Sequence, residues 1–175
     1  MSKTLAAYFS ATGTTKRVAR AVADAAGADL VEIAPATPYT AADLNWHDGS
    51  SRSTLEGKDP AARPELASAP GDLSGYDTIL LGFPIWWYVA PRIVGTWVEA
   101  ANLAGKRVVT WATSGGSAMG GTTAELKKFA PEATWVDGRV LRGTADAASW
   151  VSSLEPLPSS PHPHRLACAP PVERV

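Results

Sequence analysis

Apolar residues follow two different spacings along this chain. Continuous apolar runs predict strands at residues 5–9, 30–33, 76–83 and 106–113, and a last strand is predicted within residues 134–141. Between these runs, apolar residues recur with the spacing of one helix face. That spacing predicts one helix directly after the turn at residues 10–16. It predicts further helices at residues 91–101, 122–129 and 145–154.

The alternation of strands and helices predicts the fold class. It is typical of an α/β fold, with a parallel sheet, right-handed crossovers and helices on both faces. In such sheets, ligands bind outside the carboxyl ends of the strands, where the strand order reverses. Three unusual loops each follow a strand: a hydroxyl loop (residues 10–15), an aromatic loop (residues 84–90) and a glycine-rich loop (residues 114–121). We therefore expect all three at one edge of the sheet.

The hydroxyl loop has the composition of a phosphate-binding turn. Its sequence is Ser10-Ala11-Thr12-Gly13-Thr14-Thr15, and it leads into the first helix. A helix N-terminus supplies unpaired amides and positive dipole charge, and Ser and Thr add hydroxyl donors. The loop lacks both the Gly-Lys-Ser/Thr ending of a nucleoside-triphosphate loop and the glycine spacing of the dinucleotide fingerprint. It therefore predicts a monophosphate site, the alternative being an ordinary Thr-capped helix start.

The aromatic loop begins Pro84-Ile85-Trp86-Trp87-Tyr88. Three adjacent aromatic residues in a connection cannot all face inward, so some aromatic surface is expected to stay accessible. Such a surface can stack on a planar ligand. The alternative is a hydrophobic loop that only caps the core.

The glycine-rich loop allows a ligand to approach the backbone closely, because its glycines carry no side chains. Its candidate binding residues are Ser114, Gly115, Gly116, Ser117, Met119 and Gly120. The alternative is a flexible linker before the helix at residues 122–129, for which Thr122 is the expected N-cap.

A long polar segment, residues 38–70, separates the second and third predicted strands. Connections of this length inside a domain are often functional or loosely ordered. If the polar segment folds over the site, His47 or Arg52 could touch a ligand. Taken alone, His47 is more typical of a surface histidine than of a catalytic base.

Composition narrows the possible functions. The chain has 175 residues, 45% of them hydrophobic, a net charge of −1 and one cysteine, Cys168. It is most simply one domain, without a disulfide framework and without a reason to bind nucleic acid or an anionic membrane. No metal site is expected, since two of the three histidines, His162 and His164, lie near the C-terminus. The absence of an apolar span or a signal pattern predicts a cytoplasmic protein.

The chain resembles the flavodoxin family. Members bind flavin mononucleotide (FMN) through a Ser/Thr-X-Thr-Gly-X-Thr loop after the first strand, and residues 10–15 match every defined position. The resemblance covers residues 3–154 and looks like the short-chain branch. It implies a three-layer, doubly wound fold whose five parallel strands have the order 2-1-3-4-5. It also implies that the aromatic and glycine-rich loops contact the flavin, so that FMN is the cofactor and all three loops bind it.

The resemblance also divides the chain into an FMN-binding domain, residues 1–154, and a tail, residues 155–175. Proline recurs throughout the tail, which favours an extended or disordered segment. Exposed aromatic residues leave the oligomeric state open between a monomer and a weak homodimer.

Two departures from the family pattern leave the chemistry open. Electron-carrier flavodoxins are usually strongly acidic, whereas this chain is nearly neutral and has no acidic residue between Gly82 and Pro91. Carriers also place a glycine beside the flavin, where a peptide flips on reduction; residues 87–89 offer none, so a flip to positive φ would cost roughly 1 kcal/mol or more. The missing carboxylates predict a less negative flavin potential than that of acidic flavodoxins.

Three hypotheses follow from the sequence. The first is a redox protein that carries electrons on FMN for a partner protein. The second is an FMN-dependent oxidoreductase that takes electrons from NAD(P)H and reduces quinones or nitro compounds. The third is a cofactor-free binding module of the same fold, against which the intact hydroxyl loop argues.

Overall fold

A five-stranded parallel sheet forms the centre of the computed structural model, which describes residues 3–155. Its strands are β1 (Thr4–Tyr8), β2 (Asp29–Glu32), β3 (Thr78–Pro84), β4 (Arg107–Thr113) and β5 (Thr134–Val136). They pair in the order β2-β1-β3-β4-β5, and every pair is parallel. The predicted fold class and strand order are confirmed.

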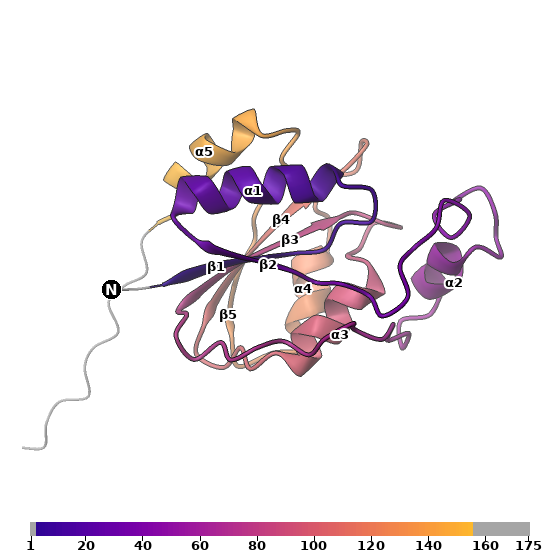
Figure 1. The fold of residues 1–175 in the computed structure, drawn as a ribbon, viewed down its shortest axis with the longest axis horizontal. Coiled ribbons are helices and arrows are strands. Elements are labelled where there is room, and N and C mark those ends of the chain that lie inside the picture. Colours follow the sequence, from indigo (N-terminus) through magenta and orange to yellow (C-terminus); the bar gives the residue numbers. More distant parts are fainter. Residues whose placement is uncertain (1–2, 156–175) are drawn as a thin grey trace, which may run out of the picture.

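Helices cover both faces of the sheet (Figure 1). One face carries α1 (Thr14–Ala26) and α5 (Ala145–Ser152), and the other carries α3 (Arg92–Ala100) and α4 (Thr122–Lys127). The short helix α2 (Arg52–Lys58) lies beyond the end of the sheet, within the polar segment (Figure 1). Three layers result, with α2 outside them.

The core consists of two clusters, one on each face of the sheet. Alternate residues of β3 face opposite sides, so Leu80 packs with α1 and α5 whereas Leu81 packs with α3 and α4. Trp111 of β4 is fully buried on the α1 side, where a Cβ on Gly82 would lie 2.0 Å from its ring. Burial on both faces explains why the central strands have continuous apolar sequences.

One predicted helix start is wrong in the described chain. Thr122 does not cap α4: the N-cap is Gly121, and the buried Thr122 hydroxyl donates back to the carbonyl of Met119. The strand predicted within residues 134–141 is present as Thr134–Val136, and the chain rejoins β4 at the Val140–Ala112 bridge. The other elements agree with the prediction to within a few residues.

The predicted tail falls almost entirely outside the described residues, since residues 156–175 are not described. Cys168, His162 and His164 belong to that part. Among residues 3–155, no helix is both long and apolar enough to cross a membrane.

Candidate functional site

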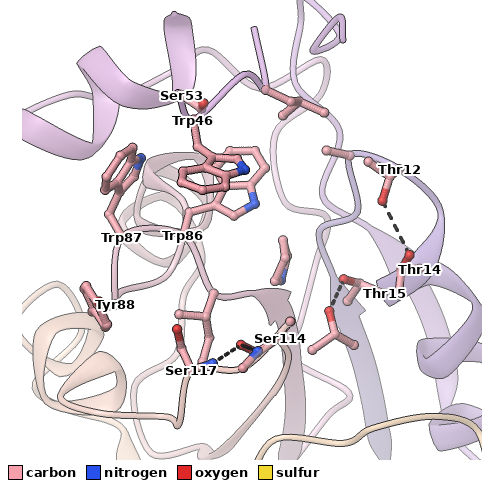
Figure 2. A pocket seen from close by; sticks show the side chains of 17 residues that line it. Thr12, Thr14, Thr15, Trp46, Ser53, Trp86, Trp87, Tyr88, Ser114 and Ser117 are labelled. Atoms are coloured by element: carbon pink, nitrogen blue, oxygen red, sulfur yellow. Dashed lines mark hydrogen bonds between the residues drawn. The ribbon is translucent and has the colours of Figure 1, made fainter. Parts of the chain in front are cut away.

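The three loops meet at the carboxyl edge of the sheet, as the topology predicts. They enclose a cavity of about 680 Å³, called the site cavity below. Figure 2 shows the hydroxyl loop on one side of it and the tryptophans on the other. The lining residues are Ala11, Thr12, Thr14, Thr15, Leu44, Trp46, Ser53, Pro84, Ile85, Trp86, Trp87, Tyr88, Thr113, Ser114, Gly115, Gly116 and Ser117.

The four hydroxyl groups of the hydroxyl loop have two different roles. Ser10 Oγ accepts a hydrogen bond from the Gly13 amide (3.1 Å), and Thr15 Oγ1 is buried against Thr113 Oγ1 (2.8 Å), so these two brace the loop. Thr12 and Thr14 are exposed, and their hydroxyl oxygens lie 3.5 Å apart (Figure 2). Thr12 and Thr14 are therefore the hydroxyls most available to a ligand.

Helix α1 begins directly behind these hydroxyls. Its N-cap is Gly13, whose φ of 91° lies in the left-handed region that glycine tolerates. No acidic residue occupies the first turn, so the unpaired amides there face no carboxylate of their own helix. The adjacent Lys16 pairs with Glu32 of β2 (2.9 Å). Burial opposes ionisation of Glu32, but hydrogen bonds from Lys16 and Tyr8 outweigh it and lower the pKa of this carboxyl.

The aromatic loop turns through two residues with positive φ. Trp86 and Val89 exchange backbone hydrogen bonds of 3.0 Å, which leaves Trp87 (φ 52°) and Tyr88 (φ 65°) in a tight turn. Such turns normally use Asn-Gly, because a side chain in this region costs about 1–2 kcal/mol per residue. The absence of glycine noted in the sequence thus coincides with strain that is already present in this structure.

Aromatic packing holds this strained turn in place. Trp86 contacts Phe9 and Tyr39 edge-on, with ring centroids 5.5 and 5.3 Å away. Trp87 lies against Gly57 of α2, where an added Cβ would be only 2.5 Å from the indole. Trp87 is nevertheless 42% exposed and Tyr88 is 75% exposed, so aromatic surface stays accessible as expected.

The polar segment supplies a wall of the site cavity that the sequence alone did not identify. Leu44, Trp46 and Ser53 line the cavity, and Trp46 is 65% exposed. His47 stacks on Trp46, with ring centroids 3.5 Å apart, but does not line the cavity. The one available signal was a tryptophan in a polar segment, where it has no core to fill.

Arg52 has a structural role at the base of this wall. It pairs with Glu56 (2.8 Å), and its guanidinium lies 3.9 Å from the centroid of the Tyr39 ring. The Tyr39 hydroxyl donates to Glu56 (2.6 Å). Burial, and then the Glu56 carboxylate, raise the pKa of this phenol, so Tyr39 keeps its proton and the contact through neutral pH. Arg52 does not line the site cavity.

Part of the glycine-rich loop completes the site cavity. Ser114 Oγ accepts hydrogen bonds from the amides of Gly116 (3.1 Å) and Ser117 (2.7 Å), which fold residues 114–117 into a compact turn (Figure 2). Met119 lines a neighbouring cavity instead, and Gly120 lines neither. Among the predicted site residues, Ser10, Gly13, Met119 and Gly120 are thus not brought to the site cavity.

The chemistry of the site cavity is that of an uncharged binding site. None of its lining residues is charged, and the described part of the chain holds no cluster of three or more His, Cys, Asp or Glu suited to a metal. Hydroxyl and amide donors gather at one end and indole rings at the other. This arrangement can hold a ligand with an anionic end and a planar end.

Comparison with known proteins places the chain in a family. The flavodoxin family model matches residues 3–154. The chain belongs to the flavodoxin family. The sheet order of this flavodoxin is thus the one that the family resemblance implies.

Two solved structures are similar to this flavodoxin in both sequence and fold. Candidate flavoproteins from Bacteroides uniformis and Bacteroides eggerthii are 48% and 47% identical, with TM-scores of 0.83 and 0.81. The alignments cover 86% and 87% of this chain and 98% and 97% of theirs. A flavoprotein from Lactobacillus acidophilus, solved in complex with FMN, is 22% identical with a TM-score of 0.63, over 86% of this chain and 99% of that one, and shares the fold. No curated protein matches the chain.

Proposed function

We propose that this flavodoxin binds FMN non-covalently in the site cavity and carries electrons on it. The observation that supports the proposal is the joining, in one uncharged cavity, of a hydroxyl-and-amide helix start and a wall of three tryptophans. The Lactobacillus acidophilus relative of the same fold was solved with FMN. When bound, FMN supplies the redox chemistry, and the protein determines how it is held and reached.

The donor set of the cavity fits FMN. The volume of the site cavity, about 680 Å³, falls within the range of roughly 300–1,000 Å³ that is usual for ligand pockets. Thr12 and Thr14 would donate to the phosphate, together with the free amides at the start of α1, and Ser10 and Thr15 would hold the loop in shape. The indoles would pack against the ring, and the turn at residues 114–117 would face its polar edge.

The decisive experiment is an absorbance titration of the purified protein with FMN. We expect flavin bands shifted by binding, and a dissociation constant roughly 10- to 100-fold larger for Thr14→Ala, because a hydrogen bond to a charged phosphate is worth about 1.5–3 kcal/mol. Thr134→Ala is the matched control, because Thr134 is exposed at the start of β5, away from the cavity. Failure to take up FMN would favour the cofactor-free binding module.

Trp46 offers a second test, since it reaches the cavity from the polar segment. Trp46 is 65% exposed and has no part in the core, so Trp46→Ala should leave the denaturation midpoint nearly unchanged. Loss of one aromatic contact should weaken FMN binding by roughly three- to tenfold, in line with about 0.5–1.5 kcal/mol per aromatic pair. Equal FMN affinity in the variant and the natural protein would contradict a contact between Trp46 and the flavin.

A second candidate function is FMN-dependent reduction of quinones or nitro compounds by NAD(P)H. It is favoured by the lack of any carboxylate in the cavity lining, because acidic residues around the flavin are typical of carriers that dock on basic partners. Reduction of the FMN-loaded protein by NADPH alone, without a partner reductase, would support this function. Reduction only through a partner reductase would support the carrier.

A further inference from the structure

A second cavity lies beside the first, on the other side of the glycine-rich loop. It has a volume of about 630 Å³ and is called the arginine cavity below. Residues 114–119 form one wall, and the other wall comes from the segment after β5, with Gly138, Arg139, Val140 and Arg142. Ser114, Gly115, Gly116 and Ser117 line both cavities. The two cavities therefore share a wall four residues long.

The backbone of the far wall is fixed against the sheet. The Ala112 amide donates to the carbonyl of Arg139 (3.1 Å), and the Leu141 amide donates to the carbonyl of Ala112 (2.8 Å). The Arg142 amide donates to the Asp146 carboxylate (2.8 Å) at the start of α5. The backbone that carries Arg139 and Arg142 is therefore fixed by hydrogen bonds to β4 and to the start of α5.

The arginine cavity carries positive charge without a lining carboxylate. Both arginines are exposed, and within residues 3–155 neither guanidinium makes an ion pair or a side-chain hydrogen bond. The nearby Asp146 carboxylate bonds to the backbone of Arg142, and no acidic residue lines the cavity. Guanidinium groups recognise phosphate through paired N–H donors, and glycine backbone on the opposite wall allows close approach.

We propose that the arginine cavity binds the phosphate groups of a nucleotide, with Arg139 and Arg142 as the recognising side chains. A concave site of this volume suits a small ligand better than the surface of an acidic protein. The shared wall places such a nucleotide next to the site cavity. Its role as a co-substrate of a flavin in that cavity rests on the proposed FMN binding and on the second candidate function, whereas nucleotide binding itself rests on neither.

Calorimetric titration of the whole protein with ADP, with and without saturating FMN, tests the proposal. We expect ADP to bind in both conditions and more tightly than inorganic pyrophosphate. Replacing both arginines (Arg139→Gln with Arg142→Gln) should raise the ADP dissociation constant roughly tenfold or more, because charge-assisted bidentate contacts to phosphate are lost. Arg20→Gln, which removes an exposed arginine from the middle of α1, is the matched control and should change ADP affinity less than twofold.

The outcomes separate this proposal from the flavin proposal. Absence of ADP binding, an equal loss in Arg20→Gln, or pyrophosphate binding as tight as that of ADP would each overturn the nucleotide site. The double variant should keep its FMN affinity, because neither arginine lines the site cavity. ADP binding without FMN uptake would refute the proposed function and leave the nucleotide site standing.

Discussion

Gly138→Ala is expected to destabilise the protein by about 3 kcal/mol, since the new methyl group has no space. An added Cβ would lie 1.4 Å from the carbonyl oxygen of Thr110 and 2.6 Å from its carbon, and both are backbone atoms of β4 that cannot rotate away. The segment that follows Gly138 must then move off the sheet, and it carries Arg139 and Arg142. Urea denaturation followed by circular dichroism measures the effect.

Gly143→Ala is the matched control for this substitution. Gly143 lies in the same region, yet a Cβ there would meet no atom within 4 Å and its φ is not in the left-handed region. Alanine at such a position restricts the unfolded chain and should be neutral or stabilising by less than about 1 kcal/mol. Equal denaturation midpoints for the two variants would show that the close approach of Gly138 to β4 is not a real constraint.

Arg92→Met is expected to cost about 2–3 kcal/mol, somewhat less than the loss of a fully buried ion-pair partner. The Arg92 side chain is 9% exposed, and its guanidinium donates to Glu125 of α4 (2.5 Å) and to the carbonyls of Glu56 (3.2 Å) and Gly57 (3.1 Å) in α2. Without it, a partly buried carboxylate and two carbonyls lose their donor. Urea denaturation followed by tryptophan fluorescence measures the loss.

The position of α2 should respond as well, because Arg92 holds the end of α2 where Trp87 packs on Gly57. We expect the fluorescence of native Arg92→Met to shift toward that of a more exposed indole. Arg63→Met is the control: its pair with Glu99 is 26% and 41% exposed, and such surface pairs contribute less than about 1 kcal/mol. If both variants lose the same stability, Arg92 is not the anchor of α2.

The sheet and the meeting of the three loops could be predicted because both depend on regular patterns. Continuous apolar runs identify buried parallel strands, and parallel topology places the ends of those strands at one edge. The wall formed by Leu44, Trp46 and Ser53 could not be predicted in this way. It is placed by polar contacts between distant residues, such as Arg92 with the carbonyls of α2, and such contacts leave no periodic signal in the sequence.

The wrongly predicted N-cap and the shortness of the last strand have local causes. Thr122 has the right side chain for an N-cap, but its hydroxyl bonds to the preceding Met119 carbonyl, so Gly121 takes the cap position. The last strand is interrupted because residues 137 and 138 leave the ladder, and only glycine at 138 lets the chain return so close to β4. The propensity of each residue taken alone contains no information on the competing Met119 carbonyl or on the neighbouring strand β4.

The turn at residues 114–117 has a thermodynamic consequence, since its two sides belong to different cavities. If a ligand in one cavity shifts this turn, the affinity of the other cavity for its own ligand changes. Linkage requires this change to be the same in both directions. The sign depends on whether the two ligands prefer the same position. Ser114 Oγ braces this turn through two hydrogen bonds. The stiffness of the turn would thus set the coupling free energy between a ligand in the site cavity and a ligand in the arginine cavity.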